Sequence, residues 1–393
     1  MSVLNYREPF TLDWIVRALD KVPFSPPFLL LIPALTLLYD GQRGVPSVDV
    51  LRELLFTKYK WCGRAVVFIL VKTISRFLSL IARNHWMVSA DKPDWNKDVL
   101  VITGGATGIG AKIVELLQVK HKAQVAVLDI AQPTYPKTAG APEPLYVRTD
   151  VTKSEDIAKA HEAIRARFGR SPSFVVSCAG IAIAGSLLQV SPESVEKTFQ
   201  VNALSNVRLA REFLPPMLQA NHGHYVTLAS GASYYTPPML SSYCMSKSAA
   251  LAFHEELSVE LRVVFKRPNI RTTICTPLKV KTLLGHSLRS SDQQFTNPDL
   301  DPIQVATAIV DALDSGRSQA LLMPLLTSLL PFVRALPDYF RSIVTTVGKR
   351  DGAITPESIA DGIRAGYGKN LRDLDPGLSK VFDEMTSTFG KSE

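Results

Sequence analysis

The sequence predicts an α/β protein, a doubly wound parallel sheet of about seven strands that follows an apolar helical extension at the amino terminus. Three observations support this prediction. From about residue 96, short apolar runs rich in β-branched residues alternate with helical stretches. A glycine-rich segment lies between the first of these runs and the first helical stretch. The preceding 95 residues have a different character, apolar and basic.

Composition excludes several classes of protein. Of the 393 residues, 46% are hydrophobic and 20% are charged, so the chain is neither disordered nor fibrous. Its four cysteines lie far apart without paired spacing, which argues against a metal site or disulfides and favours a reducing, cytosol-facing environment. The first ninety residues hold eleven Lys and Arg against six Asp and Glu, an excess of five within a net charge of +8. Because this excess lies among apolar residues, it suits an anionic membrane surface better than nucleic acid.

The amino-terminal extension, residues 1–95, contains two apolar segments. The first, "PPFLLLIPALTLLY", is interrupted by Pro33 and is shorter than the ~20 residues of a straight spanning helix. The second, "AVVFILVKTISRFLSLIA", is longer, and Lys72 and Arg76 lie on one of its faces, as in an interfacial helix with a basic stripe. These segments predict membrane association, either on the surface or across the bilayer. Ordinary helices packed on the following domain are the alternative.

Residues 96–325 form the predicted sheet domain. Its strands are the runs "VLVIT", "AQVAVLD", "LYVRTD", "FVVSCAG", "HYVTLAS", "IRTTICTP" and "QALLMP", separated by helical stretches such as "GAKIVELLQVK" and "SEDIAKAHEAIRARF". Residues 326–393 are expected to form a third part. Its apolar segment, broken by Pro331 and Pro337, could cap a substrate cleft, contact the membrane or do both, and a polar tail follows from about Gly348.

The glycine segment "TGGATGIG", Thr103 to Gly110, follows the first strand and opens a helix. In that context glycines let the backbone approach a pyrophosphate, which the helix amino terminus attracts. Asp129, nineteen residues after Gly110, ends the next strand, where a carboxylate can accept hydrogen bonds from the adenosine ribose hydroxyls and would repel a 2′-phosphate. The segment therefore predicts a dinucleotide site that favours NAD(H) over NADP(H). A glycine-rich turn in another kind of α/β protein is the alternative.

A second group of residues follows the fifth predicted strand. Tyr243 and Lys247 are four residues apart and share one face of a predicted helix, Ser230 ends the strand thirteen residues before Tyr243, and Asn202 lies in "VNALSNV". Together with "TGGATGIG", this combination resembles the short-chain dehydrogenase/reductase family over roughly residues 97–325. The apolar extension narrows the resemblance to membrane-associated members that act on retinoids and steroids. A chance occurrence, with Ser230 as a strand-end cap and Asn202 as a helix breaker, is the alternative.

The resemblance implies a Rossmann-type sheet and a role for each of four residues. Tyr243 would exchange a proton with the substrate oxygen, and Ser230 would hydrogen-bond that oxygen. Lys247 would lower the pKa of the Tyr243 phenol, together with the positive nicotinamide ring, and would hold the nicotinamide ribose. Asn202 would kink its helix and hold a water that links Lys247 to solvent.

The resemblance also implies the contacts to the cofactor. No metal is expected. The residues expected to bind the dinucleotide are Thr103, Gly104, Gly108, Ile109, Gly110, Asp129, Asp150, Val151, Ala179, Gly180, Asn202, Tyr243, Lys247, Pro277, Val280 and Thr282.

The chain departs from the family pattern at two places. Ser177 and Cys178 stand where paired asparagines are usual, which predicts a loss of hydrogen bonds in the sheet, and Leu278 follows Pro277 in place of glycine, which puts the shape of that loop in doubt. Outside the site, the histidines of "NHGHY", His222 and His224, are expected in a solvated turn without a partner cluster. Two tyrosines soon after Ser230 could either line the substrate pocket or pack in the interior: Tyr234 and Tyr235.

The function implied is hydride transfer between a nicotinamide cofactor and the alcohol or carbonyl of a lipophilic substrate. An NADPH-dependent ketoreductase of lipid or secondary-metabolite synthesis is one alternative, and a non-catalytic scaffold on the same fold is another. The expected partners are the substrate, a membrane surface and a second copy of the chain, joined through the helices that carry Asn202 and Tyr243. We expect the protein on the cytosolic face of the endoplasmic reticulum or of a lipid droplet.

Overall fold

The computed structural model describes residues 6, 8–21, 57, 60–185, 187–188, 190–287 and 294–348. The chain divides into two compact units, one formed by Met1–Arg7 with Ser89–Glu393 and the other by Glu8–Val88. The boundaries predicted at residues 95 and 325 remain predictions.

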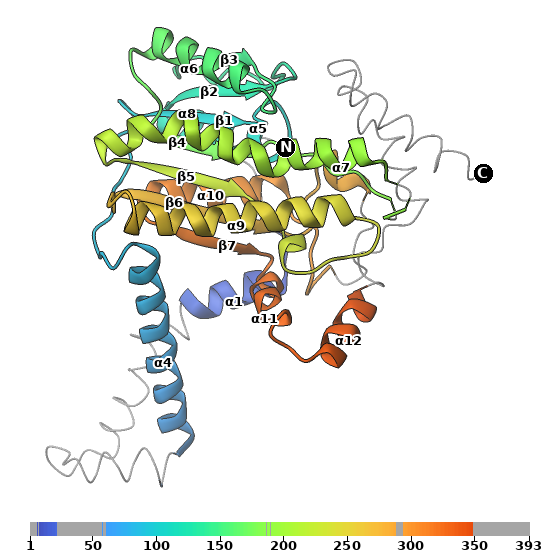
Figure 1. The fold of residues 1–393 in the computed structure, drawn as a ribbon. Helices are drawn as coiled ribbons and strands as arrows, with labels where there is room; N and C mark the ends of the chain where they lie inside the picture. The colour runs from blue at the N-terminus through green and yellow to red at the C-terminus, as the bar shows by residue number, and fades with distance from the viewer. Residues whose placement is uncertain are drawn as a thin grey trace, which may run out of the picture. The chain divides into compact units, whose positions relative to one another are not determined.

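The larger unit is built on one parallel sheet of seven strands, as the sequence predicts (Figure 1). The spatial order is β3-β2-β1-β4-β5-β6-β7. The strand order therefore reverses beside β1, which pairs with both β2 and β4. In sheets of this kind, a ligand-binding crevice lies at the carboxyl ends of the strands where the order reverses. The strands are β1 (Val99–Thr103), β2 (Gln124–Asp129), β3 (Leu145–Arg148), β4 (Phe174–Ser177), β5 (Gly223–Leu228), β6 (Ile270–Pro277) and β7 (Gln319–Met323).

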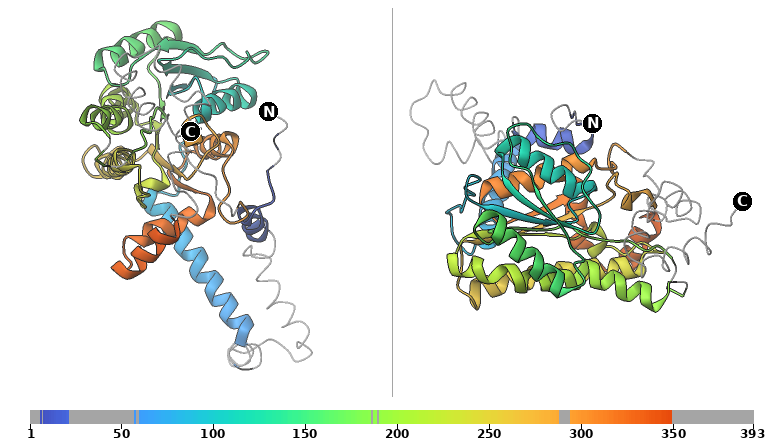
Figure 2. Two further views of the ribbon diagram at one scale, coloured as in Figure 1. Left: turned by 90° about the vertical axis from the view of Figure 1, so that its right-hand side faces the viewer. Right: turned by 90° about the horizontal axis from the view of Figure 1, so that it is seen from above.

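Helices cover both faces of this sheet, and Figure 2 shows the two layers from other directions. In β1, Leu100 faces the core shared with α5 and α10, whereas Val101 faces the core shared with α6, α8 and α9. This alternation buries every position of the strand and explains why its first four residues are apolar. The bounds are α5 (Gly108–His121), α6 (Ser154–Phe168), α8 (Ser205–Ala220), α9 (Ser241–Val263) and α10 (Pro302–Ser315).

Shorter elements lie at the carboxyl end of the sheet and after β7. The elements that precede β7 are α7 (Pro192–Phe199), the π-helix η3 (Gln200–Leu204) and the 3-10 helices η4 (Gly231–Ser233) and η5 (Leu284–Ser287). The apolar segment that follows β7 is helical and consists of η6 (Leu325–Leu329), α11 (Leu330–Val333) and α12 (Asp338–Gly348).

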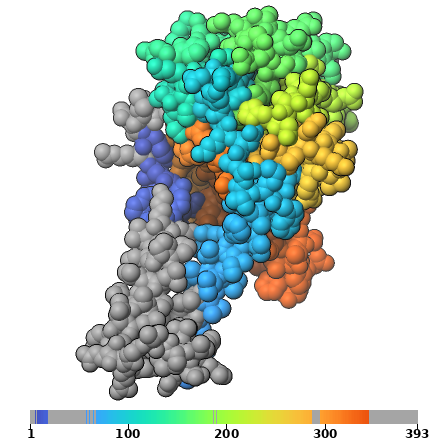
Figure 3. Space-filling view, turned by 90° about the vertical axis from the view of Figure 1, so that its left-hand side faces the viewer, coloured from blue at the N-terminus to red at the C-terminus, as the bar shows by residue number. Residues whose placement is uncertain are grey.

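The smaller unit contains two described helices, α1 (Leu12–Lys21) and α4 (Lys60–Arg83). The second predicted apolar segment is part of α4, which Figure 3 shows in light blue at the molecular surface. The first apolar segment lies outside the described residues. Among the helices that are described, none is both long and apolar enough to cross a bilayer. Large apolar side chains of α4 that are exposed are Val67, Phe68, Leu70, Val71, Ile74, Phe77 and Leu78.

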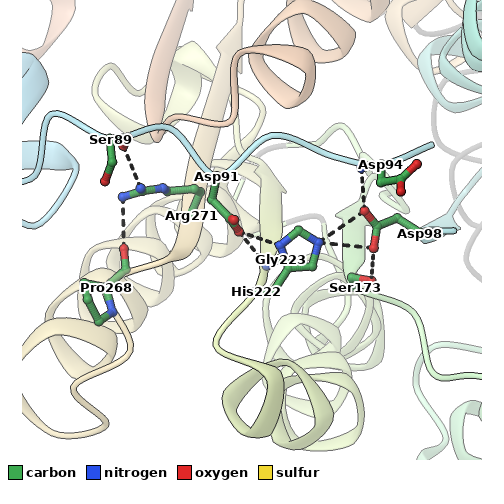
Figure 4. A network of polar contacts seen from close by, with 9 residues as sticks. All are labelled: Ser89, Asp91, Asp94, Asp98, Ser173, His222, Gly223, Pro268 and Arg271. Atoms are coloured by element: carbon green, nitrogen blue, oxygen red, sulfur yellow. Dashed lines mark hydrogen bonds and ion pairs between the residues drawn. The ribbon is translucent and has the colours of Figure 1, made fainter. Parts of the chain in front are cut away.

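The expectation that His222 lies in a solvated turn without partners is wrong. Its ring lies between two carboxylates, with Nδ1 2.6 Å from Asp91 Oδ2 and Nε2 3.1 Å from Asp98 Oδ1 (Figure 4). These carboxylates precede β1 by a few residues and are far from His222 in the sequence, so no local pattern announces the cluster. Hydrogen bonds to Asp91 and Asp98 raise the pKa of His222 to about 10.

The same expectation is wrong for His224, which is buried in β5. Its Nε2 lies 2.8 Å from the hydroxyl oxygen of Thr273 in the neighbouring strand β6. Burial lowers the pKa of His224 to about 3, so the imidazole is neutral at physiological pH.

Candidate active site

The glycine segment between β1 and α5 brings its backbone against the end of β4. Gly104 has a φ of +65°, and a Cβ there would lie 2.8 Å from the Cα of Ala179. A Cβ on Gly110 would lie 2.2 Å from the carbonyl oxygen of Gly104. Only glycine fits at these two positions, because any larger residue would collide with backbone. The loop therefore adopts the close turn that a pyrophosphate-binding site requires.

The amino terminus of α5 is suited to an anion. The residue before it, Thr107, makes no side-chain cap hydrogen bond, and its first turn contains no acidic residue. First-turn N–H groups and the helix dipole attract a phosphate at such a position. Gly108 begins α5, and the side chain of Ile109 packs against the core, so Ile109 would contact a cofactor through its backbone.

Thr103 ties β1 to the end of β4 at the floor of the crevice. Its Oγ1 accepts hydrogen bonds from the N–H groups of Cys178, at 3.1 Å, and Ala179, at 3.2 Å. Burial raises the pKa of the Tyr225 phenol on β5, while a hydrogen bond with the Ser177 hydroxyl acts in the opposite direction. Hydrogen bonds thus join the strands at both positions where the usual asparagines are replaced.

Asp129 ends β2 beside the glycine segment, as the sequence predicts. Its carboxylate accepts hydrogen bonds from Ala106 N at 2.9 Å and from Ala131 N at 3.0 Å, so β2 and the loop after β1 meet at this side chain. Burial raises its pKa even though these N–H groups favour the ionised form. Tyr135 and Tyr146 lie close enough for the carboxylate to raise the pKa of each phenol, in addition to the effect of burial. A carboxylate with two aromatic neighbours fits the adenosine end of a dinucleotide.

The remaining predicted adenosine contacts lie near β3 and β4. Asp150 Oδ1 accepts hydrogen bonds from the N–H and the hydroxyl of Thr152, which shapes the turn before α6. Val151 belongs to a buried cluster against which Ala179 and Tyr243 pack. This cluster connects the predicted adenosine contacts with the predicted catalytic tyrosine.

Asn202 lies in the π-helix η3, in agreement with the predicted helix kink. Its amide bridges the loop after β4 and the helix α9. Oδ1 accepts from Ile181 N at 2.8 Å, and Nδ2 donates to Ile181 O at 2.8 Å and to Ser246 Oγ at 3.0 Å. Ser246 in turn donates to the carbonyl of Tyr243 at 2.8 Å. Asn202 is thereby held against the helix that carries Tyr243 and Lys247.

Asn202 and Lys247 both approach Gly180 on the side where a side chain would project. A Cβ added to Gly180 would lie 3.4 Å from Asn202 Oδ1 and 3.5 Å from Lys247 Nζ. The amide and the ammonium therefore lie beside the same α-carbon, and their membership of one proton relay stays a prediction.

Ser230 and Tyr243 face each other although they come from different elements. Ser230 caps η4 and accepts a hydrogen bond from Ala232 N at 3.2 Å, while Tyr243 lies in the first turn of α9. The Ser230 hydroxyl lies near enough to the Tyr243 phenol to lower the pKa of that phenol. Lys247 lies one turn further along α9, with Nζ 5.9 Å from the centroid of the Tyr243 ring.

The protein groups alone do not give Tyr243 the lowered pKa that we expected. Burial raises it to about 12, and this effect outweighs the hydrogen bond with Ser230. Burial also lowers the pKa of Lys247 to about 8, and its Nζ donates to the backbone carbonyl of Leu228 at 2.8 Å. A phenol in this environment needs a further positive charge nearby before it can act as a base at neutral pH.

The loop after β6 lies over the glycine segment and next to Ser230. Ser230 Oγ donates to the carbonyl of Pro277 at 3.3 Å, and a Cβ on Gly108 would lie 3.3 Å from Thr282 Cγ2. Val280 pairs with Leu300 through an isolated bridge, which fixes the course of this loop. The predicted residues Pro277, Val280 and Thr282 thus belong to a segment that contacts both halves of the site.

Sequence reasoning missed several residues that shape the site. Ser233 is fully buried, and its Oγ donates to the carbonyl of Lys247 at 2.8 Å. Arg334, far along the chain, donates to the carbonyl of Ser233 at 2.7 Å. Neither residue has a spacing or composition signal, because each acts on backbone carbonyls that only the folded chain brings near.

Comparisons with known proteins agree with this geometry. The model of the short chain dehydrogenase family matches residues 98–293. Dehydrogenase RED2 of Cochliobolus heterostrophus is 35% identical over 212 residues, which cover 54% of this chain and 78% of that protein. Estradiol 17-beta-dehydrogenase 11 of Homo sapiens is 28% identical over 252 residues, which cover 63% of this chain and 82% of that protein.

Solved structures support the same fold. A short chain dehydrogenase/reductase from Burkholderia phymatum, in complex with NAD, superposes with a TM-score of 0.54 at 23% identity, covering 64% of this chain and 96% of that chain. The chain described here belongs to the short chain dehydrogenase family. It is an oxidoreductase that acts on alcohol and carbonyl groups with a nicotinamide dinucleotide.

Proposed function

We propose that this enzyme transfers a hydride between NAD(H) and the alcohol or carbonyl carbon of a lipophilic substrate that it meets at a membrane surface. The observation that carries the chemical part of the proposal is the placement of the Ser230 hydroxyl beside the Tyr243 phenol, whose pKa it lowers, with Lys247 one turn away. An oxygen placed between two hydroxyls can be held by one and exchange a proton with the other.

In this proposal each side chain has a distinct task. The nicotinamide supplies or accepts the hydride when bound. The Ser230 hydroxyl holds the substrate oxygen, and the Tyr243 phenol donates a proton to it or removes one. Lys247 holds the nicotinamide ribose and, when charged, favours the phenolate. Asn202 holds the end of the relay, with its Oδ1 on the same side of Gly180 as Lys247 Nζ.

The surroundings of Asp129 support NAD(H) as the preferred cofactor. Burial raises the pKa of the Tyr135 phenol, and the nearby Asp129 carboxylate raises it further. A 2′-phosphate bound here would be repelled by Asp129 and would also have to displace the N–H donors of this carboxylate. The alternative is an NADPH-dependent ketoreductase. A titration in which NADPH binds more tightly than NADH would favour that alternative.

A lipophilic substrate is supported by the apolar groups next to Ser230. The residue after it, Gly231, is covered by the side chains of Leu278 and Leu330. One of the relatives is named as an estradiol dehydrogenase, and a steroid is a substrate of this polarity. Retinoids and long-chain hydroxy compounds have a similarly low polarity.

Contact with a membrane is supported by α4. Its seven exposed large apolar side chains lie on a helix that contains five Lys and Arg and no Asp or Glu. Such a helix can bury apolar side chains in the headgroup region while its cations pair with anionic lipids. We place the enzyme on the cytosolic face of the endoplasmic reticulum or of a lipid droplet, where NAD(H) is available.

Apolar side chains are also exposed on the helices that carry the site, among them Val207 on α8, and Met245 and Val259 on α9. We propose that two copies of the chain pair through these helices. Sedimentation of the full chain and of Val259→Glu would test this, since the variant should dissociate if α9 forms the interface.

A substrate panel tests the chemical proposal. The full chain would be incubated with NAD+ and estradiol, retinol or a long-chain secondary alcohol, and the absorbance of reduced nicotinamide followed. We expect turnover of at least one of them, abolished by Tyr243→Phe with no change in the dissociation constant for NADH. Tyr339→Phe is the matched control, because that phenol is exposed on α12 and is not among the residues assigned to the site. Unchanged turnover in Tyr243→Phe would refute the assignment.

Vesicle flotation tests the membrane proposal separately. The full chain should float with phosphatidylcholine vesicles that contain phosphatidylserine. Phe68→Glu combined with Phe77→Glu should reduce this binding, whereas equal binding of that variant would show that α4 is not the contact.

A further inference from the structure

The segment after β7 reaches back to the turn that carries Ser230. Arg334, which directly follows α11, donates from Nη2 to the carbonyl oxygen of Ser233 at 2.7 Å and from Nε to that of Tyr234 at 3.4 Å. The hydroxyl of Ser248 on α9 donates to the same Ser233 carbonyl at 3.1 Å and lies 3.5 Å from Arg334 Nη2. One guanidinium thus joins α11, the turn after Ser230 and the helix α9.

A second contact is apolar. A Cβ on Gly231 would lie 2.4 Å from Leu278 Cδ2 and 3.3 Å from Leu330 Cδ1. Leu330 opens α11 and precedes Arg334 by four residues, so the two side chains project from the same side of this helical turn. α11 therefore meets the turn with a leucine against Gly231 and with an arginine on the carbonyls that follow.

The turn held in this way carries the predicted substrate-binding hydroxyl. The N–H of Ser233 donates to the carbonyl of Ser230 at 2.9 Å, and Ser233 Oγ donates to the carbonyl of Lys247 at 2.8 Å. A shift of Ser233 would therefore move Ser230 relative to Tyr243 and Lys247. Hydrogen bonds to Ser230 within the turn and to Lys247 on α9 hold Ser233 in place, and Arg334 binds its carbonyl oxygen.

We propose that α11 is docked on the Ser230 turn through Leu330 and Arg334, and that Arg334 is a positioning residue for the reaction. The inference rests on the proposed role of Ser230. It makes the apolar segment after β7 part of the catalytic apparatus, because release of α11 from the turn would loosen the alignment of the Ser230 hydroxyl with the Tyr243 phenol. A substrate that displaces α11 from the Ser230 turn would bind but would be turned over slowly. The segment after β7 would therefore contribute to substrate specificity.

Kinetics of the full chain with NAD+ and estradiol test the proposal, with retinol as a second probe. For Arg334→Ala we expect kcat to fall about tenfold, since small misplacements of reacting groups cost up to ~10²-fold. The dissociation constant for NADH should stay within about twofold, because the glycine segment is untouched. Arg334→Lys should recover part of kcat. Arg170→Ala, an exposed arginine after α6, is the matched control and should leave kcat unchanged.

A pH profile separates positioning from a general loss of stability. The hydrogen bond with Ser230 lowers the pKa of Tyr243, and alcohol oxidation requires the phenolate. In Arg334→Ala the rising limb of kcat for oxidation should therefore move to higher pH. An Arg334→Ala variant with the kcat and the pH limb of the original enzyme would overturn the proposal.

Hydrogen exchange distinguishes failure of the docking proposal from failure of the proposed function. In Arg334→Ala and in Leu330→Ala, amides of residues 231–235 should exchange faster, whereas those of α5 should be unchanged. If the original enzyme oxidises none of the probes but these amides respond, the docking stands and the proposed function fails. Unchanged exchange at residues 231–235 overturns the docking whatever the activity.

Discussion

Lys247 donates a hydrogen bond of 2.8 Å to the backbone carbonyl of Leu228, the last residue of β5. The ammonium is buried, and burial lowers its pKa from 10.5 to about 8. Holding a charge at this position costs free energy that a structural role alone would not require. The lysine is therefore better explained by the chemistry proposed for it than by the stability of the fold.

The first prediction concerns Lys247→Met. An apolar side chain of similar length removes the desolvation penalty, so the free energy of unfolding should rise by on the order of 1–3 kcal/mol at neutral pH while oxidation of the alcohol is lost. A lysine with a lowered pKa destabilises the fold most below that pKa, and the penalty disappears as pH rises from about 8 to 10.5. The difference in urea unfolding between variant and original should shrink over this range. A variant that is less stable at neutral pH would contradict the argument.

The second prediction concerns Gly180→Ala. The new methyl group would lie 3.4 Å from Asn202 Oδ1 and 3.5 Å from Lys247 Nζ, at the near limit of contact with two polar groups. We expect kcat to fall about tenfold or more because the relay between these groups is disturbed. Thermal unfolding should be nearly unchanged, since the methyl group meets no backbone atom. Unaltered kcat would show that the space around Gly180 has no part in proton transfer.

The third prediction concerns Asp129→Arg. The change removes the carboxylate that accepts N–H donors from Ala106 and Ala131 and introduces a cation near the adenosine end of the site. The ratio of kcat/KM for NADP+ to that for NAD+ should rise by about tenfold or more, equivalent to ~1.4 kcal/mol. Titration of both reduced cofactors by fluorescence is an independent measurement. A ratio that falls or stays constant would place the ribose elsewhere.

The fourth prediction concerns His222→Gln. Hydrogen bonds with Asp91 and Asp98 raise the pKa of His222 from 6.5 to about 10, so its ion pairs stabilise the fold fully below pH 6.5 and less as pH rises through about 10. Burial opposes the ionisation of Asp98, but hydrogen bonds from His222 and Ser173 lower its pKa overall. Glutamine keeps a donor and loses the charge. We expect a loss of about 2 kcal/mol in unfolding free energy near pH 6.

The difference in unfolding free energy between His222→Gln and the original protein should shrink as pH rises. At pH 10 and above, the original protein has itself lost the positive charge, so variant and original should unfold at similar urea concentrations. A difference that grows with pH would mean that charge on His222 is not the source of the stability. Activity should be unaffected, because the cluster lies at the amino ends of the strands, opposite the site.

The sequence by itself determined the sheet and the contents of the crevice. The strands are rich in apolar and β-branched residues because both faces of the sheet are covered. Glycines recur where backbone meets backbone, so the sequence shows both features locally. The order Ser230, Tyr243, Lys247 is likewise fixed by short spacings along one strand end and one helix. The sequence shows these features because they depend only on residues a few positions apart.

Only the tertiary structure decided the rest. His222 finds its carboxylates more than 120 residues away, and Arg334 reaches carbonyls about 100 residues before it. Burial raises the pKa of Tyr243, and the sequence does not reveal this because burial depends on everything that packs around the phenol. Long-range pairing and desolvation are properties of the assembled chain, and no local pattern of residue types encodes them.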